Sequence, residues 1–367
     1  MSASAFRKFI TTTEYVFRMG KKVAVIGGGM FGVCSALELA RGGADVTLFE
    51  AEHNILLRAS GSNQWRLHSG YHYPLSDETA EACRRSLPLF RNRYSEAIVT
   101  NQDHYYAIAS ESRVPTNEYK EFCDRHDLWY DEIETDLIST ETVDTVLEVD
   151  EDHVDVDILR EQMWDELQAF GVNVVLGRSI DSIESLSGFD SVVEATYGKN
   201  KQLLENYPSL QREYQFEICE VPVIRLPDRY KRKNIIVVYG PFMSTDHLGR
   251  KGLFAMGDYE IMVHAENIGE RPKIPTEYED LLGAGIVNAP DQSNFDQFKK
   301  HGKKYIPGVA DCEYVGSLFS VRSKLPGVEE TAKRPTLVQR EGDVVSVFGG
   351  KLVTALGAAE EVRAEIL

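Results

Sequence analysis

The 367-residue sequence has few cysteines, and their arrangement argues against two kinds of framework. The five are scattered, odd in number and never spaced as CxxC: Cys34, Cys83, Cys123, Cys219 and Cys312. Neither a disulfide scaffold nor a cysteine-based metal site is therefore expected. The pattern is typical of reduced thiols in a cytoplasmic protein.

Long apolar runs and an excess of positive charge are also missing. No run approaches the roughly 18 apolar residues that span a bilayer. The 58 acidic residues exceed the 40 basic ones, so the net charge is −18. This charge opposes nucleic acid and anionic membranes as main partners, although a local basic pocket can still bind a small anion. With 43% apolar residues, the chain is expected to be globular, with one large or two interleaved domains.

The first 20 residues precede the earliest recognisable strand and are interpreted as an N-terminal extension or alternative start. Their Ser, Thr, Arg and Lys content is faintly similar to that of a transit peptide. Glu14 and the lack of a clear cleavage pattern weigh against that interpretation.

The segment 21–50 carries the most specific pattern in the chain. Residues 23–26 form a short apolar run with β-branched side chains, which predicts a strand buried on both faces. Gly27, Gly29 and Gly32 follow at the G-x-G-x-x-G spacing. In this spacing the first glycine allows a sharp turn, the second lets the backbone approach a pyrophosphate, and the third lets the helix pack closely.

A helix over residues 31–41 and a second strand over 44–49 complete a βαβ unit. The helix N-terminus would direct free N–H groups and its positive dipole end at a diphosphate. Glu50 closes the second strand, where a carboxylate can accept hydrogen bonds from a ribose diol. An acid there favours the free 2′-OH of FAD or NAD over the 2′-phosphate of NADP. The ordered unit predicts a dinucleotide site rather than an ordinary glycine-rich turn.

The rest of the chain alternates between predicted helices and strands. Residues 59–74 form a loop rich in Ser, Gly, Asn, His and Tyr between two regular elements, and such loops are usually functional. Helices are predicted over 77–94 (with Ser76 or Asp77 as N-cap), 117–127 and 158–170 (capped by Asp157). Strands are predicted over 104–110, 172–176, 179–183 and 191–195.

The second half predicts an antiparallel sheet and a closing βα unit. Strands over 214–225, 234–240, 252–256 and 259–263 would form the wall of a substrate domain. Residues 275–301 are predicted to be mostly helical, 344–348 a strand and 352–366 a helix. The acid-rich run 148–157 is interpreted as a solvated surface, because it lacks the glycine and spacing of a calcium loop.

Several motifs together resemble the FAD-dependent oxidoreductase superfamily of D-amino-acid oxidase, glycine oxidase and glycerol-3-phosphate dehydrogenase. They are IGGGMFG with Glu50, the loop RLHSGYHYP, the returning strand VVEATYG, Arg322, and FGGKLVTA near the end. The resemblance covers nearly the whole chain. It implies an α/β fold, with a Rossmann-like, glutathione-reductase-type FAD-binding domain interleaved with an α+β substrate domain on an antiparallel sheet. The expected ranges are 21–75, 145–200 and 320–367 for the FAD-binding domain, and 76–144 and 201–319 for the substrate-binding domain.

The resemblance implies an extended FAD. Its ADP half would rest on residues 27–32 and Glu50, and its isoalloxazine between the loop 60–73 and the turn 349–354. The expected cofactor-binding residues are Gly27, Gly29, Met30, Phe31, Gly32, Glu50, Ala51, Ser60, Ala195, Thr196, Gly349, Gly350, Lys351, Leu352 and Thr354.

Lys351 matches the GGK lysine that lies near the flavin pyrimidine edge in glycerol-3-phosphate dehydrogenase. Independently, reduced flavin bears negative charge near N1 and O2, which a lysine and a helix N-terminus would stabilise.

Four residues are candidates for catalysis: His68, His72, Arg322 and Lys351. Related enzymes place a histidine of the loop near the flavin, and some attach it covalently, whereas His68 could also simply bond loop backbone. Arg322 matches the position at which relatives clamp a carboxylate or phosphate, for which its planar fork is suited, although a surface salt bridge is the plainer interpretation. Arg66 and Arg334 are weaker candidates of the same type.

The predicted function is oxidation of a C–N or C–O bond of an amine, amino acid or hydroxy acid by hydride transfer to flavin. An amine can bind deprotonated without a base, whereas an alcohol needs one, for which His68 or His72 is the candidate. Oxygen or a quinone-like carrier would accept the electrons. The alternatives are a non-redox flavoenzyme such as a mutase or lyase, an NAD-dependent dehydrogenase, and a flavin-binding protein without turnover. Trp65-Arg66 and the segment 239–252 match no well-known member and leave the substrate open.

Overall fold

The computed structural model describes residues 20–198, 203–240, 242–249, 251–328 and 331–367. The predicted N-terminal extension thus lies almost wholly outside the described residues. Within them, no helix is long and apolar enough to cross a membrane. The five cysteines are all buried and free.

A six-stranded sheet is built from three separate stretches of the chain. Its order is β16 (Leu337–Glu341), β17 (Val344–Phe348), β9 (Ser191–Glu194), β1 (Lys22–Ile26), β2 (Asp45–Phe49) and β8 (Asn173–Val175). All neighbours are parallel except the β16–β17 hairpin. Val25 at the centre is wholly buried and lies between Leu48 and Val193 in the register, as expected for a strand covered on both faces.

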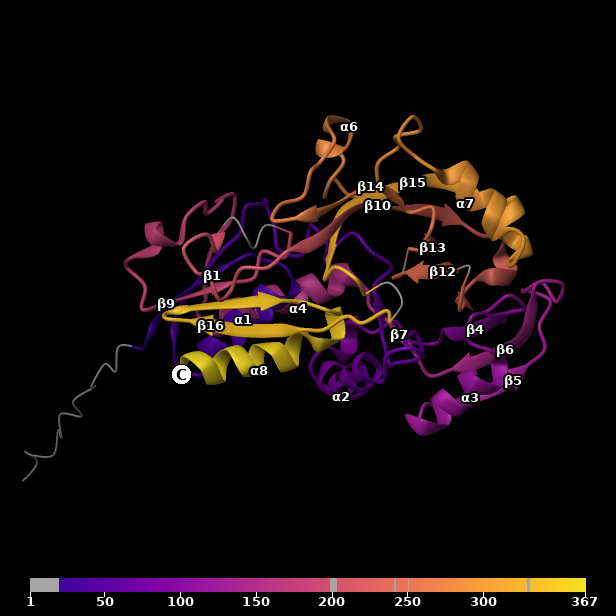
Figure 1. Ribbon diagram of the computed structural model, residues 1–367, viewed down its shortest axis with the longest axis horizontal. Coiled ribbons are helices and arrows are strands. Elements are labelled where there is room, and N and C mark those ends of the chain that lie inside the picture. Colours follow the sequence, from indigo (N-terminus) through magenta and orange to yellow (C-terminus); the bar gives the residue numbers. More distant parts are fainter. Residues whose placement is uncertain (1–19, 199–202, 241, 250, 329–330) are drawn as a thin grey trace, which may run out of the picture.

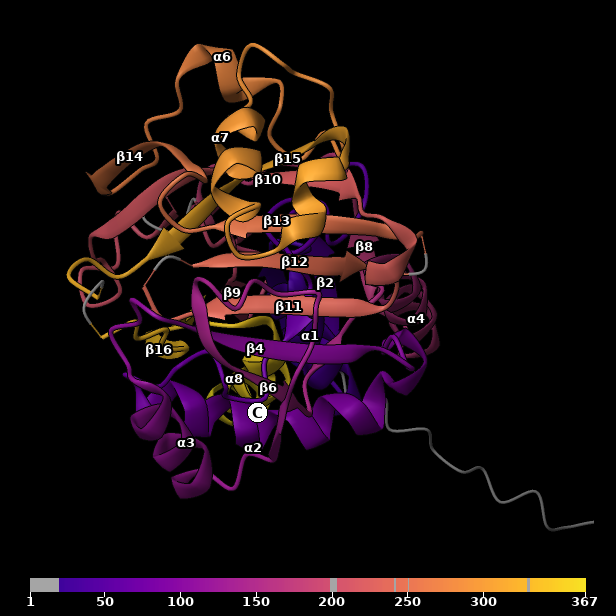
Figure 2. The same cartoon turned by 90° about the vertical axis from the view of Figure 1, so that its right-hand side faces the viewer.

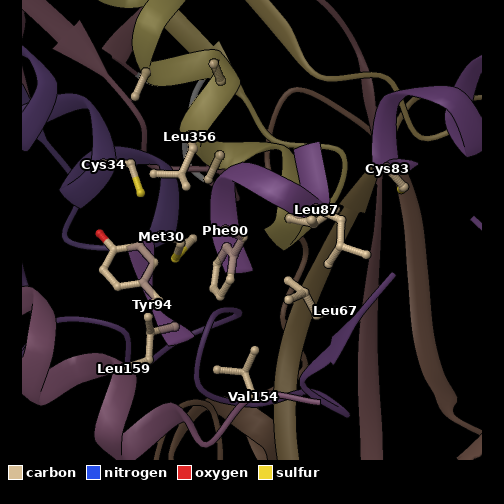
Figure 3. Packing of buried hydrophobic residues seen from close by; sticks show 14 of the residues in the cluster. Met30, Cys34, Leu67, Cys83, Leu87, Phe90, Tyr94, Val154, Leu159 and Leu356 are labelled. Carbon is tan, nitrogen blue, oxygen red and sulfur yellow. The ribbon is translucent and has the colours of Figure 1, made fainter. Parts of the chain in front are cut away.

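Helices α1 (Met30–Arg41) and α8 (Ala355–Ile366) pack against each other beside this sheet (Figure 1). Helices α2 (Asp77–Arg93) and α4 (Val156–Ala169) add to the same core. Figure 3 shows Met30, Phe90 and Leu356 among the side chains that meet there. Phe90 is wholly buried, so truncation to alanine would cost about 3–5 kcal/mol of the free energy of unfolding.

A nine-stranded sheet forms the second layer (Figure 2). Its order is β14 (Val263–Gly269), β10 (Tyr214–Arg225), β13 (Leu253–Asp258), β12 (Met243–Leu248), β11 (Lys233–Val238), β4 (Asp103–Ala109), β6 (Val143–Val149) and β5 (Tyr130–Ile133), and β15 (Glu313–Lys324) also pairs with β10. Only the β4–β11 pair is parallel. Two short strands outside this sheet, β3 (Arg66–Leu67) and β7 (Asp152–His153), pair with each other.

The chain passes repeatedly between the two sheets, as predicted. We propose that the two domains be drawn along the sheets. The expected boundaries at 145 and 320 fall inside β6 and β15, which both belong to the nine-stranded sheet. Three short helices flank this sheet, namely α3 (Thr116–Arg125), α6 (Thr276–Glu279) and α7 (Phe295–Gly302).

Three predicted elements are wrong. Residues 179–183 run as coil into a 3-10 turn, Ile183–Leu186, and residues 259–262 form a turn before β14. Between Pro275 and His301 only α6 and α7 are helical, because the intervening chain makes isolated bridges with β15. Local sequence could not reveal those long-range contacts.

The caps of two helices follow from short polar side chains. Ser76 caps α2, since its Oγ accepts a hydrogen bond from the Thr79 N–H at 3.3 Å. Helix α4 begins two residues earlier than predicted. Its cap is Asp155, whose Oδ1 accepts from the N–H groups of Asp157 and Ile158, so the prediction of Asp157 as cap is wrong.

Candidate active site

A cavity of about 1330 Å³ lies between the two sheets. The ends of β1, β2 and β9 open into it from one side, and β10, β12, β13 and β15 from the other. Carboxyl ends of parallel strands are the usual ligand-binding edge of such a sheet. The predicted residues that line it are Gly27, Gly29, Met30, Phe31, Glu50, Ala51, Ser60, His68, His72, Ala195, Thr196, Arg322, Gly349, Gly350, Lys351 and Leu352.

The β1–α1 turn forms one end of the cavity. Gly27 has φ +106°, and a Cβ there would lie 2.6 Å from the carbonyl oxygen of Ala195, so only glycine fits. The Glu50 carboxylate accepts a hydrogen bond from the Gly28 N–H at 2.5 Å. Ser60 Oγ accepts from the Met30 N–H at 3.0 Å at the start of α1. A helix N-terminus, a glycine turn and an acid thus converge as a dinucleotide site requires.

Two predicted cofactor residues do not line the cavity. Gly32 packs so closely that a Cβ there would lie 1.8 Å from the Gly27 carbonyl oxygen, which matches the third-glycine role of close helix packing. Thr354 lies behind the glycine turn, where its Oγ1 donates to the carbonyl oxygen of Lys351 at 2.8 Å.

The turn at Gly349-Gly350 brings Lys351 into the cavity wall. A Cβ on Gly350 would lie 2.0 Å from the carbonyl oxygen of Arg334, so the chain can pass there only as glycine. The Lys351 ammonium lies 5.1 Å from the centre of the Tyr73 ring. Burial, together with the charges of Arg334 and Arg322, lowers the pKa of Lys351 to about 7. An anion bound beside Lys351 would therefore restore its charge.

The loop 59–74 supplies an aromatic and imidazole wall. The ring of His68 lies 5.3 Å from those of His72 and Tyr73, and the His72 ring lies 5.1 Å from that of Phe242. Burial and the charge of Lys351 hold the pKa of His68 well below its usual range. Burial likewise lowers the pKa of His72, so both imidazoles are neutral near pH 7.

Arg322 projects from β15 into the cavity and is held on one side. Its Nε donates to the Glu217 carboxylate at 2.6 Å, and its guanidinium carbon lies 4.9 Å from the centre of the Tyr259 ring. Glu217 is almost wholly buried and also pairs with Lys324 at 2.7 Å. The plainer interpretation of Arg322 as a surface salt bridge does not describe this contact, because the partner carboxylate is buried.

The two weaker arginine candidates, Arg66 and Arg334, differ in whether their guanidinium groups could bind a ligand. Arg66 is buried and engaged by Asp246, to which its Nε donates at 3.0 Å, so it is not free to clamp a ligand. Arg334 lines the cavity, and its Nη1 donates to the carbonyl oxygen of Lys333 at 2.8 Å.

The cavity wall contains buried polar atoms that a ligand would satisfy. Within the described residues, hydrogen-bond partners are lacking for Trp65 Nε1, His72 Nδ1, Tyr73 Oη, Tyr239 Oη and Arg322 Nη2. Buried polar groups are nearly always bonded in folded proteins, so these atoms mark where a polar ligand belongs. Together with the glycine turn, they fit a dinucleotide that carries a polar ring system. Among the described residues, no group of three or more His, Cys, Asp or Glu side chains could hold a metal ion.

The interpretation of 148–157 as a solvated surface is wrong for most of the run. Glu151, His153 and Asp155 are buried, because β7 pairs with β3 and carries this stretch beneath the loop. Sequence reasoning therefore missed Glu151, and it missed Glu217 and Tyr259 as well. Glu217 stands in a stretch that alternates polar and apolar residues, among them Ile218 and Val221, so nothing in the local sequence marks it. Its contact with Arg322 can be recognised only once β10 and β15 are paired.

Comparison with known proteins agrees with this geometry. Two curated relatives are each 26% identical to the chain over 93% of its length. They are the FAD-dependent monooxygenase kojA of Aspergillus flavus, of which 84% is covered, and the FAD-dependent monooxygenase FPY4 of Fusarium mangiferae, of which 89% is covered.

Solved structures share the fold at low identity. Glycine oxidase from Geobacillus kaustophilus matches with a TM-score of 0.71 at 13% identity, covering 95% of this chain and 96% of that one. NikD, described as an unusual amino acid oxidase essential for nikkomycin biosynthesis, matches with a TM-score of 0.69 at 14% identity, covering 94% of both chains. The sequence model of the family described as FAD dependent oxidoreductase matches residues 22–364. The chain therefore belongs to the FAD-dependent oxidoreductase family, and it is an enzyme that uses FAD.

Proposed function

We propose that this enzyme oxidises a C–N or C–O bond of a small substrate that carries an anionic group, with Arg322 as the anion clamp. Bound FAD supplies the two-electron acceptor for such a reaction. The roles of the chain are to hold the cofactor, orient the substrate and move its proton.

The observation that carries the proposal is the one-sided fixation of Arg322. Nε of Arg322 donates to Glu217, and one face of the guanidinium lies over the Tyr259 ring. Nη2 is buried without a hydrogen-bond partner among the described residues. An arginine held in this way is preorganised, so little conformational entropy is lost when an anion binds. A carboxylate at Nη2 would make a charge-assisted hydrogen bond to this buried atom.

The cations of the cavity wall favour the same conclusion. Arg322, Arg334 and Lys351 all line the cavity, and Lys351 adds its positive charge when it is protonated. In a chain of net charge −18, three basic side chains at one cavity favour an anionic ligand.

We assign to the cofactor residues the roles that the sequence predicts. The β1–α1 turn and Glu50 would hold the ADP half, and the loop 60–73 and the turn 349–352 would enclose the ring system. Lys351 would lie at the ring end, where its positive charge favours the anionic reduced form.

The names of the curated relatives point to a second candidate, a monooxygenase. The two reactions differ in their need for a reductant. An oxidase or dehydrogenase takes electrons from its substrate, whereas a flavin monooxygenase needs an external donor and oxygen.

An absorbance spectrum tests the proposal. The purified protein should show a flavin spectrum, and acid precipitation tells whether the flavin is released or stays with the pellet through a covalent link. Small amines, amino acids and hydroxy acids are then added without oxygen. Bleaching by a substrate alone supports the proposal. Bleaching only after NADH or NADPH is added would favour a monooxygenase, and no bleaching by any donor would favour a mutase or lyase.

A further inference from the structure

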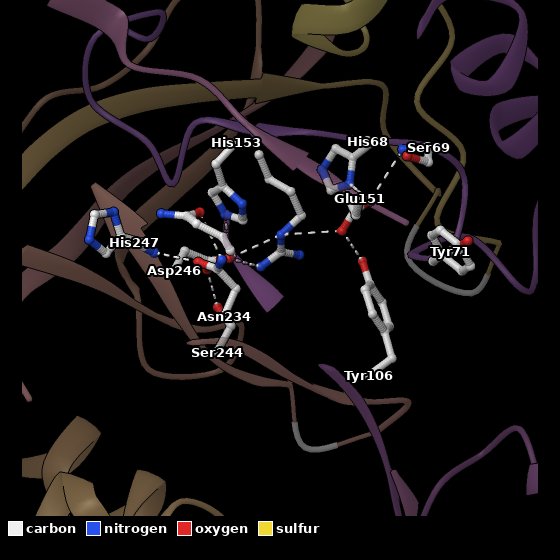
Figure 4. A network of polar contacts seen from close by, with 12 residues as sticks. His68, Ser69, Tyr71, Tyr106, Glu151, His153, Asn234, Ser244, Asp246 and His247 are labelled. Carbon is white, nitrogen blue, oxygen red and sulfur yellow. Dashed lines mark hydrogen bonds and ion pairs between the residues drawn. The ribbon is translucent and has the colours of Figure 1, made fainter. Parts of the chain in front are cut away.

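A buried carboxylate lies beneath His68 and is not part of the cavity wall. The side chain of Glu151 has no exposed surface, and its Oε1 lies 3.5 Å from Nδ1 of His68. Its Oε1 also accepts from the Ser69 N–H at 3.2 Å, and its Oε2 accepts from Tyr106 Oη at 2.6 Å. Figure 4 shows these side chains converging on Glu151. The two donors hold the carboxylate in one orientation.

The cation nearest to Glu151 is mostly engaged elsewhere. Arg66 Nε lies 3.7 Å from Glu151 but donates to Asp246 at 3.0 Å, and Arg66 Nη2 donates to the same Asp246 oxygen. Asp246 is further held by Ser244 Oγ at 2.7 Å and lies 3.0 Å from Nε2 of His153. Two buried carboxylates thus share one guanidinium. Glu151, which has the longer contact to this guanidinium, is the carboxylate that faces His68.

The geometry of His68 assigns different tasks to its two nitrogens. Nδ1 is buried and lies 3.5 Å from the Glu151 carboxylate, within ion-pair distance although without a hydrogen bond among the described residues, whereas the side chain keeps 13% exposure and lines the cavity. The edge that meets the cavity is therefore the one that bears Nε2. A carboxylate at Nδ1 favours the tautomer with a proton there, which leaves a lone pair on Nε2 directed at the cavity.

We propose that Glu151 is a positioning residue that fixes His68 as the proton acceptor of this site, so that the oxidised bond is a C–O bond of a substrate bearing a hydroxyl group. The inference rests on the proposed function and names its substrate class. The anion clamp and the hydroxyl together describe a hydroxy acid.

The balance of the reaction shows why a base matters for this class. Oxidation of an alcohol to a carbonyl removes the hydroxyl proton and a hydride from carbon. Nε2 of His68 would take the proton as the C=O bond forms, and bound FAD would supply the acceptor for the hydride equivalent. The imidazolium that results lies against the Glu151 carboxylate, which stabilises its charge. A neutral amine needs no such base, because its nitrogen lone pair is already free.

His72 offers a comparison within the same loop. In the described part of the chain, Nδ1 of neither histidine makes a hydrogen bond, but Nδ1 of His68 has the Glu151 carboxylate 3.5 Å away, whereas His72 lies against the rings of His68, Tyr73 and Phe242. Without an orienting carboxylate, His72 gains no preferred tautomer and no stabilised imidazolium. The titratable groups that face His68 are Glu151, Lys351, Arg66, Asp246, His153, His72 and Tyr73.

Histidine-selective ¹⁵N NMR of the FAD-loaded enzyme tests the inference without any substrate. The His68 signal is assigned by its loss in His68→Gln. The expected result is a neutral His68 with its proton on Nδ1 at pH 7.5 in the wild type. In Glu151→Gln, the midpoint of His68 protonation should fall by at least one pH unit relative to the wild type, because the stabilising charge is gone.

Glu220→Gln is the matched control. Glu220 is also wholly buried and also pairs with a histidine, His264, at 2.9 Å, so the same substitution perturbs an equivalent pair elsewhere. In Glu220→Gln, the midpoint of His68 protonation should equal that of the wild type. A proton on Nε2 of His68 in the wild type would overturn the inference. So would an unchanged midpoint of His68 protonation in Glu151→Gln. The first of these measurements uses the wild type, so it holds even if Glu151→Gln folds poorly. Failure of the purified chain to bind FAD would instead contradict the proposed function.

Discussion

Arg322 and Glu217 stand directly opposite each other on β15 and β10, and their side chains meet at 2.6 Å while Nη2 of Arg322 has no partner among the described residues. Replacing Arg322 with Lys should weaken the binding of a carboxylate ligand about 10- to 100-fold, because a charge-assisted hydrogen bond contributes about 1.5–3 kcal/mol. The measurement is the dissociation constant from ligand-induced changes in the flavin spectrum.

Arg225→Lys is the control for that substitution. Arg225 is an exposed residue of β10, the strand that carries Glu217, and it pairs with the exposed Glu313. Its replacement should leave the dissociation constant within about twofold, since exposed ion pairs contribute little. Equal loss in both variants would mean that the effect is not specific to a clamp.

The buried Lys351 predicts a pH dependence of stability. Its folded-state pKa of about 7 lies below the ordinary lysine value, so between pH 7 and about 10.5 the unfolded chain holds a proton that the folded chain lacks. The free energy of unfolding of the FAD-free protein should therefore rise with pH in this window, by at most about 1.4 kcal/mol per pH unit. Urea unfolding at pH 7 and pH 9 checks this, and Lys351→Met should abolish that part of the increase. A flat or falling profile in the wild type would contradict a buried, depressed lysine.

Lys351 should also affect the reduction potential of bound FAD. Lys351→Met removes a positive charge beside the proposed flavin position and should lower the reduction potential of bound FAD by roughly 30 mV or more, which is a tenfold change in a two-electron equilibrium. Spectroelectrochemical titration measures it. A potential unchanged in the variant would place Lys351 away from the ring.

The β1–α1 turn predicts a contrast between two glycines. Gly27→Ala forces a Cβ to 2.6 Å from a carbonyl oxygen at φ +106°, whereas Gly188 has open space around its Cβ position and no positive φ. Gly27→Ala should lower the free energy of unfolding by about 1–3 kcal/mol and abolish FAD retention, while Gly188→Ala should change neither. Thermal unfolding and the flavin content after gel filtration give the answer, and retention of FAD by Gly27→Ala would refute the dinucleotide role of the turn.

The substrate class can be tested with matched pairs of compounds. Lactate and alanine, malate and aspartate, and mandelate and phenylglycine each differ only in hydroxyl against amine. We expect the hydroxy member of a reactive pair to bleach the flavin at least about tenfold faster, since His68 accepts its proton. Faster bleaching by the amino member would contradict the assignment of the oxidised bond.

The residues proposed to bind the cofactor could be located from the sequence because they lie in one local pattern. The strand, the glycine spacing, the helix and Glu50 lie within 30 consecutive residues, and the structure places them at the edge of one cavity. The loop histidines and Lys351 could also be located, because short motifs surround them.

The substrate end could not be predicted in the same way. Glu217 reaches Arg322 only through the pairing of two strands that lie about 100 residues apart, and strand pairing is not written in local sequence. Glu151 lies in a run whose composition is that of a solvated surface, and it is buried only because β7 pairs with β3. Both residues act through side chains distant in sequence, so no single motif contains them.

The most direct test of the account is a single turnover without oxygen. FAD-loaded enzyme is mixed with one equivalent of the hydroxy acid that bleaches it, and the organic products are identified by mass spectrometry. The account predicts one keto acid formed for each flavin bleached, with no added reductant. A product that carries an additional oxygen atom, or a product that forms only with NADPH and oxygen present, would contradict it.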